Sequence, residues 1–173
     1  KLKEEYKDII TIIAPRHINR VTKIQSLSEK YKLSAQILNE NDKIVDNKKI
    51  IIINYFGALK NYFKFAKSVF IGKSMLEKLK EDAGQNPIEA AKLNCKIYHG
   101  PYVYNFEEIY QILEKIKISK KIHNFKELSN NLITDLRTPK KEFNQVTDPI
   151  KSLAQKTMID TMKLIDNFIY NDN

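Results

Sequence analysis

One segment of the chain joins an arginine to the start of a predicted helix. Arg16 follows the apolar run Ile9–Ala14 and Pro15, and a helical pattern begins at His17. A guanidinium group can bind a phosphate through two parallel hydrogen bonds, and a helix N-terminus favours the same negative charge. This segment therefore predicts a phosphate contact, although an ordinary surface arginine would have the same spacing.

A second segment could hold the sugar of a nucleotide. Gly84 and Gln85 lead into Asn86, Pro87, Ile88 and Glu89, where Pro87 suits the first position of a helix. Backbone N–H groups at a helix start can bind an anion, and the carboxylate of Glu89 can accept hydrogen bonds from ribose hydroxyls. A glutamate in a first helical turn is also common for reasons of helix stability alone.

A third segment, Phe56-Gly57-Ala58, follows four consecutive isoleucines. Glycine permits a tight turn from a strand into a helix and lets the backbone approach a ligand closely. A plain turn is the competing interpretation.

Apolar runs of strand length alternate with helical patterns along the whole chain. This alternation predicts an α/β fold, a Rossmann-like parallel sheet flanked by helices, with ligands bound beyond the carboxyl ends of its strands. The predicted strands are residues 9–14, 35–38, 50–55, 68–71, 96–99 and 118–122, and the predicted helices are residues 17–31, 59–66, 86–93, 106–117, 125–136 and 148–170. We expect a polar linker at residues 138–147.

Composition and motifs exclude several classes of protein. No GxGxxG or complete Walker A motif is present, and the three histidines show no metal-ligand spacing with Cys95, so we predict no metal site. We expect Cys95 to be a small buried side chain. A net charge of +9, almost all from lysine, favours anionic partners but also fits an AT-rich genome. No apolar run is long enough to cross a bilayer.

Five stretches together resemble the C-terminal domain of the transferases of 3-deoxy-D-manno-octulosonic acid (Kdo). Their order and spacing match the family over about residues 9–113, and the Asn-Pro-Ile-Glu-Ala-Ala and Gly-Pro-x-x-x-Asn-Phe motifs are the most specific. The stretches are residues 12–17, 55–59, 69–74, 84–91 and 100–109.

The resemblance implies the GT-B architecture, in which the C-terminal half binds the donor CMP-Kdo in a cleft between two Rossmann-like domains. It places nine residues at the nucleotide, with Arg16 on the phosphate and Glu89 on the ribose. These residues are Pro15, Arg16, Phe56, Gly57, Ala58, Asn86, Pro87, Ile88 and Glu89. By the same resemblance, residues 1–137 form the nucleotide-sugar domain without its first strand, and residues 138–173 form a linker and a C-terminal helix.

The resemblance also implies the activity of the parent enzyme, a glycosyltransferase of lipopolysaccharide biosynthesis. It would transfer Kdo to a lipid A precursor, without metal or cofactor, at the cytoplasmic face of the bacterial inner membrane, where the basic charge suits an anionic surface. The family's catalytic base lies in the N-terminal domain. Because the chain starts without Met and inside a helical pattern, we expect a soluble fragment that binds donor without transferring sugar.

The chain departs from the family pattern at Ala58, Lys73 and Gln85, where a Glu, a Gly and a His are usual, and in a longer charged loop at residues 75–83. Two alternatives remain at this point. They are another GT-B glycosyltransferase or sugar-nucleotide epimerase that uses a UDP or GDP sugar, and a non-catalytic interaction domain that docks through its last helix. A nucleic-acid-binding module would suit the basic charge, but the aromatic residues are not interleaved with arginine and no recognition motif is present, so we expect no nucleic-acid partner.

Overall fold

The computed structural model describes Tyr6, residues 8–77, residues 84–138 and five single helical positions further on, namely Ser152, Gln155, Ile159, Met162 and Lys163. The predicted linker and C-terminal helix therefore lie almost wholly outside the described residues, as does most of the charged loop 75–83. The chain divides into two compact units, Lys1–Ala66 and Lys67–Asn173.

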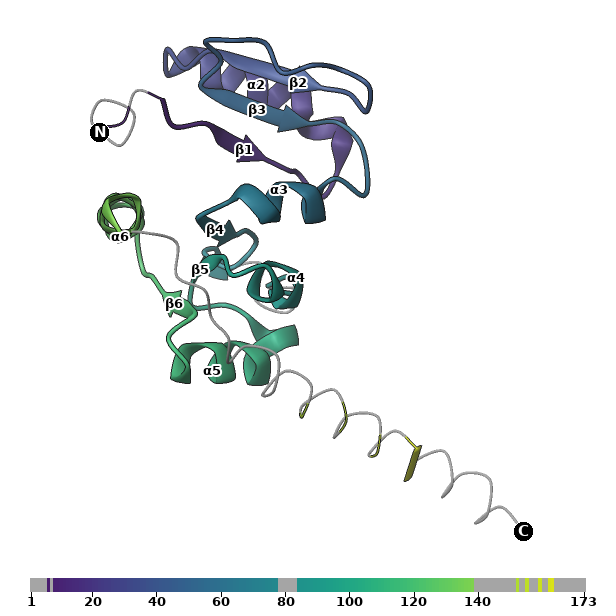
Figure 1. Ribbon diagram of the computed structural model, residues 1–173, viewed down its shortest axis with the longest axis vertical. Helices are drawn as coiled ribbons and strands as arrows, with labels where there is room; N and C mark the ends of the chain where they lie inside the picture. The colour runs from purple at the N-terminus through teal and green to yellow at the C-terminus, as the bar shows by residue number, and fades with distance from the viewer. Residues whose placement is uncertain are drawn as a thin grey trace. The chain divides into compact units, whose positions relative to one another are not determined.

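The first unit contains a three-stranded parallel sheet. The strands β1 (Thr11–Ile13), β2 (Ala35–Leu38) and β3 (Ile50–Ile53) pair in the order β1-β3-β2. A short 3₁₀ turn, η1 (Ile18–Arg20), precedes α2 (Val21–Lys30), which packs on β2 and β3 (Figure 1). The helix α3 (Leu59–Phe65) follows β3.

The central strand β3 is buried on both faces because all four of its residues are isoleucine. Ile50 and Ile52 pack in one apolar cluster with Val21 of α2, while Ile51 and Ile53 pack in a second cluster that includes Ala58. An uninterrupted β-branched run is typical of a parallel strand covered on both sides.

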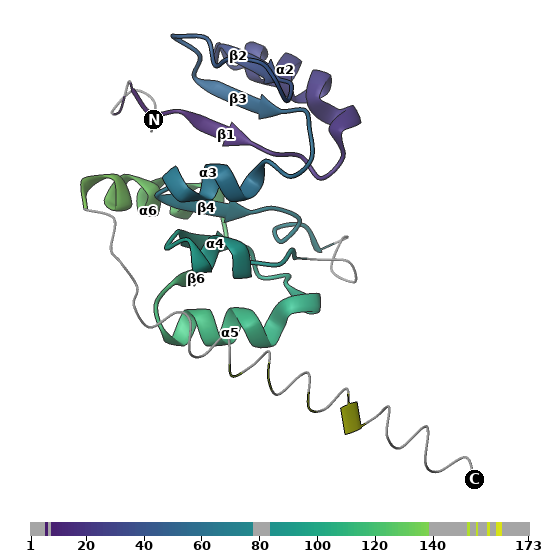
Figure 2. The same cartoon turned by 45° about the vertical axis from the view of Figure 1, so that its right-hand side comes forward.

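The second unit repeats this plan with β4 (Ser68–Ile71), β5 (Lys96–His99) and β6 (Ser119–Lys121), which pair in parallel in that order. Its helices are α4 (Ile88–Lys92), α5 (Glu107–Lys115), which extends the 3₁₀ turn η3 (Tyr104–Phe106), and α6 (Phe125–Arg137). Figure 2 shows α6 on one side of these strands and α4 and α5 on the other.

The side chains of successive β5 residues point to opposite faces of this second sheet. The Tyr98 hydroxyl donates to Asp135 Oδ2 of α6 (2.7 Å), which also accepts from the Ser68 hydroxyl (2.7 Å). His99, the next residue, points to the other face, where its ring lies 4.2 Å from the ring of Tyr110 of α5. Burial raises the pKa of both the Tyr98 and the Tyr110 hydroxyls, so both remain protonated donors at physiological pH.

The parallel α/β organisation predicted from the sequence is confirmed, with its hydrogen bonds forming two sets of three strands among the described residues. The ranges 35–38, 68–71 and 96–99 are correct to the residue. The first predicted strand is wrong in its burial. Ile12 of β1 is 39 % exposed, because β1 lies at the edge of its sheet, where the described residues pair it with β3 alone.

Two predicted helices also need correction. The first begins with the 3₁₀ turn η1 rather than as an α-helix at His17. The helix predicted at residues 86–93 covers only Ile88–Lys92, because the Asn86 side chain accepts the backbone N–H of Ile88 (2.9 Å) and holds the segment before it in a turn.

A buried serine joins the loops that follow β4 and β5. The Ser74 hydroxyl donates to the Ile71 carbonyl (2.7 Å) and accepts from the Gly100 N–H (2.8 Å), while its own carbonyl accepts from Tyr102 N–H (3.0 Å). A Cβ at Gly100 would stand 2.1 Å from the Ser74 carbonyl oxygen, so only glycine fits there. The segment before α4 is tied to the same loop, because Gly84 N–H donates to the Lys73 carbonyl (3.1 Å).

Replacing Ser74 by alanine should destabilise the fold by about 1–3 kcal/mol, because it leaves the buried Gly100 N–H without its acceptor. Urea unfolding of the 173-residue chain measures the change. Ser26→Ala is the matched control, since the Ser26 hydroxyl is exposed on α2 and bonds only the Thr22 carbonyl at 3.1 Å. Equal stabilities of the two variants would show that the Ser74 hydroxyl does not hold the loops together.

Lys73 adopts a left-handed backbone conformation, with a φ of 61°. This conformation costs a non-glycine residue roughly 1–2 kcal/mol, and glycine avoids most of that cost. We therefore expect Lys73→Gly to raise the free energy of unfolding by about 1 kcal/mol, measured with the same urea titration. Lys23→Gly, an exposed position within α2, should instead lower it by a similar amount. A loss of stability in Lys73→Gly would contradict the strain at this position.

Candidate functional site

The turn after β1 exposes an arginine with no partner. Pro15 is half-buried, whereas Arg16 is exposed and makes no hydrogen bond or ion pair within the described part of the chain. Its guanidinium group therefore keeps all of its donors for a ligand. The physical role predicted for Arg16, a phosphate contact, is open to it in this geometry.

The turn after β3 lies at the same edge of the first sheet as the turn after β1. The two strands are parallel neighbours, with Ile13 paired to Ile52. Gly57 has a φ of 82°, which confirms that the turn needs glycine. Phe56 is 75 % exposed beside it. The structure thus brings together the two predicted segments of the first unit.

Ala58 is 4 % exposed and packs in the cluster of Leu38, Ile51 and Ile53. Its side chain has no polar atom and little free surface, so only its backbone could face a ligand. The same packing gives a physical reason for the departure from the family pattern, since a glutamate here would place a carboxylate against three apolar side chains.

The segment before α4 belongs to the second unit. Asn86 and Glu89 are exposed, Ile88 is half-buried and Pro87 is buried. The Asn86 side chain accepts the backbone N–H of Ile88 in the turn before α4, and Glu89 lies in the first turn of that helix. The hydroxyl of Tyr110 donates to the Gln85 carbonyl (2.9 Å), so a hydrogen bond from α5 holds this segment in place.

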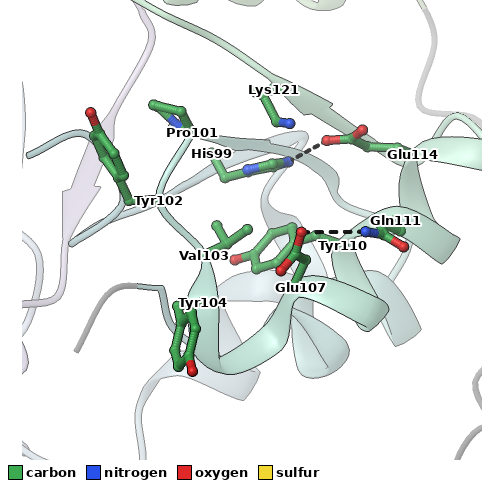
Figure 3. A pocket seen from close by; sticks show the side chains of 10 residues that line it. All are labelled: His99, Pro101, Tyr102, Val103, Tyr104, Glu107, Tyr110, Gln111, Glu114 and Lys121. Carbon is green, nitrogen blue, oxygen red and sulfur yellow. Dashed lines mark hydrogen bonds and ion pairs between the residues drawn. The ribbon is translucent and has the colours of Figure 1, made fainter. Parts of the chain in front are cut away.

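A cavity of about 460 Å³ lies beside this segment, at the carboxyl end of β5 (Figure 3). His99, Val103 and Tyr110 form its buried floor, and Glu107, Gln111, Glu114 and Lys121 contribute polar groups around it. The sequence reasoning treated Gly100–Pro101 only as a strand end and did not identify this cavity. One available signal was the spacing of Glu107, Gln111 and Glu114, which places three polar side chains on one face of α5.

His99 is the buried titratable group of this cavity. Its Nδ1 lies 2.7 Å from the Gly100 carbonyl oxygen and its Nε2 lies 2.9 Å from Glu114 Oε1. Burial lowers the pKa of the His99 imidazole, while the Gly100 carbonyl and the Glu114 carboxylate act in the opposite direction. A neutral imidazole has one N–H group, so it can donate to only one of these two acceptors.

Within the described residues, no three His, Cys, Asp or Glu side chains are placed to hold a metal ion. Cys95 is buried, as predicted. No helix in the described ranges is long and apolar enough to span a membrane.

Comparison with known proteins gives relatives over most of the chain. It is 31 % identical over 131 residues (76 % of this chain) to the 3-deoxy-D-manno-octulosonic acid transferase of Rickettsia prowazekii. It is 28 % identical over 170 residues (97 % of this chain) to the transferase of the same name from Rickettsia conorii. The chain spans only 27 % and 34 % of the length of these two relatives. No protein-family model matches the chain.

A solved structure shares the fold. The C-terminal CMP-Kdo binding domain of WaaA from Acinetobacter baumannii superposes with a TM-score of 0.69 over 90 % of this chain and 77 % of that chain, at 18 % sequence identity. The sequence relatives and this shared fold confirm the resemblance that the motifs indicated: the chain is a relative of the Kdo transferases and has the fold of their C-terminal, donor-binding half.

Proposed function

We propose that this chain is the donor-binding part of a glycosyltransferase that moves Kdo from CMP-Kdo to a lipid A precursor. The observation that carries the proposal is the similarity to Kdo transferases along nearly the whole chain, together with the fold of a CMP-Kdo binding domain. The parallel sheets add a physical reason, since the predicted nucleotide segments follow the carboxyl ends of β1, β3 and β4.

Each exposed residue of these segments has a role that its chemistry allows. Arg16 would bind the phosphate of CMP through its unpaired guanidinium group. Glu89 would accept hydrogen bonds from the ribose hydroxyls, and Asn86 would orient the backbone at the start of α4. The Phe56 ring is free to stack on a flat ligand. Pro15, Gly57, Ala58, Pro87 and Ile88 would shape the surrounding backbone.

The transfer step itself would need the rest of the parent enzyme. The chain spans about a third or less of the relatives' length, and we assign the catalytic base and the lipid acceptor site to the N-terminal domain. The parent would act without metal or cofactor and invert the donor carbon. It would work at the cytoplasmic face of the bacterial inner membrane, where a charge of +9 favours an anionic surface.

Calorimetric titration of CMP into the 173-residue chain tests this proposal. We expect CMP to bind and UMP and GMP to bind measurably more weakly, because a cytosine site rejects bases with different donors and acceptors. Arg16→Ala and Glu89→Ala should each weaken CMP binding by about tenfold or more, since each removes hydrogen bonds to a charged or polar group of the ligand.

Two control variants match these substitutions in charge and exposure. Arg20→Ala removes an exposed arginine from η1, and Glu108→Ala removes an exposed glutamate from the first turn of α5. Both should leave CMP affinity unchanged. Tighter binding of UMP or GMP would favour a GT-B enzyme with another sugar nucleotide. If Arg16→Ala and Arg20→Ala weakened CMP binding equally, the loss would reflect the overall positive charge. That result would contradict the role assigned to Arg16.

A further inference from the structure

The cavity beside α5 has the size and lining of a small-molecule site. Its volume of about 460 Å³ falls within the usual range for such sites, roughly 300–1,000 Å³. The floor is buried and mostly apolar, and the polar side chains stand around it (Figure 3). None of the nine residues assigned to the nucleotide lines it. The cavity is therefore distinct from the residues assigned to the nucleotide.

The polar groups around the cavity are rich in acceptors that the described part of the chain leaves unused. Within that part, Glu107 Oε1 accepts only a long contact from Gln111 Nε2 (3.4 Å), and Glu114 uses Oε1 alone, on His99. These side chains project from one face of α5, and Lys121 of β6 lies near Glu114 and His99 (Figure 3). A ligand with several hydroxyl groups would satisfy the carboxylates as a donor and Lys121 as an acceptor.

Charge around the cavity disfavours an anion. Burial lowers the pKa of the His99 imidazole, whose Nε2 lies 2.9 Å from Glu114 Oε1. The carboxylates of Glu107 and Glu114 stand around the cavity together with one ammonium group, that of Lys121. A ligand with uncharged hydrogen-bond donors avoids the repulsion that an anion would meet there.

Tyrosine rings supply flat surfaces between these polar groups. Tyr102 and Tyr104 stand on the loop that follows β5, and Tyr110 lies in the floor against His99. Tyr104 is 74 % exposed, so its ring has free surface at the rim. Aromatic faces pack against the apolar C–H face of a ring whose edges carry polar groups.

We propose that this cavity is a binding pocket for a neutral, polyhydroxylated ring, such as an uncharged sugar unit. Carboxylates and an amide on α5 bind the hydroxyl groups, Lys121 donates from β6, and the tyrosine rings contact the ring face. The pocket is a site separate from the nine nucleotide residues. It does not depend on the proposed nucleotide function, and either can fail while the other holds.

Amide chemical-shift titration of the isotopically labelled 173-residue chain tests the pocket. The probes are methyl glucoside, methyl galactoside and myo-inositol at millimolar concentrations, with cyclohexanol as a ring of similar size that has one hydroxyl. We expect at least one polyol to shift amides around residues 99–114 and 121, and cyclohexanol to shift them at least about tenfold less at equal concentration. Glucuronate, which adds a negative charge, should bind more weakly than the neutral sugar.

The variant Glu107→Ala/Gln111→Ala should weaken polyol binding by about tenfold, while Glu108→Ala, an exposed neighbour outside the cavity, should leave it unchanged. Tyr104→Ala should also weaken binding, and Tyr31→Ala, an equally exposed tyrosine in the first unit, should not. All four variants alter exposed side chains, and their amide spectra report whether the fold is kept. CMP added to the same samples reports the nucleotide site separately.

Three outcomes would overturn the proposal. The first is the absence of localised shifts with every polyol. The second is stronger binding of cyclohexanol or of a charged sugar, which would assign the cavity to another class of ligand. The third is equal binding by the Glu107→Ala/Gln111→Ala variant and its control.

Discussion

The contact between Ser74 and Gly100 is the constraint on which the start of α4 and the cavity of the second unit depend. Its two neighbouring strands end in loops that must lie against each other, and the Ser74 hydroxyl fills the space between their backbones with two short hydrogen bonds. Gly100 allows this approach because it has no side chain. From this junction the chain reaches both the start of α4, through Lys73 and Gly84, and the cavity, through Tyr102 and Val103.

A second set of contacts that fixes this region comes from Tyr110 of α5. Tyr110 lies in the cavity floor, packs against His99 and donates to the Gln85 carbonyl. One side chain thus contacts both the cavity and the segment that precedes Asn86.

Sequence alone predicted the strands well because their signal is local. The four isoleucines of β3 and the short runs of β4 and β5 contain their own pattern of burial, and neighbouring glycine and proline mark their ends. The left-handed turn at Gly57 was predictable for the same reason. Exposure of Ile12 was not, because an apolar run does not show whether its strand lies in the middle of a sheet or at its edge.

The cavity was hidden for a different reason. Its floor combines residues of β5 and α5 that are eleven positions apart, and α5 reads as an ordinary amphipathic helix whose polar face meets water. The exposed residues Arg16 and Glu89 were predicted from their places at a strand-to-helix junction and at a helix start, and the family resemblance then implied the same roles. Their exposure in the structure is compatible with those roles. The burial of Ala58 and Pro87 depends on tertiary packing, which a motif does not reveal.

The left-handed positions of the backbone have a consequence at the level of the gene. Within the described ranges, five non-glycine residues have positive φ, and all are lysine or asparagine: Lys32, Asn47, Lys73, Asn94 and Lys117. The whole chain has only four glycines. Lysine and asparagine codons consist almost entirely of A and T, whereas every glycine codon starts with two G bases. A drift of base composition toward A and T would favour lysine or asparagine over glycine at such turns and so introduce backbone strain. The protein would then lose stability at these turns without any selection on what it binds.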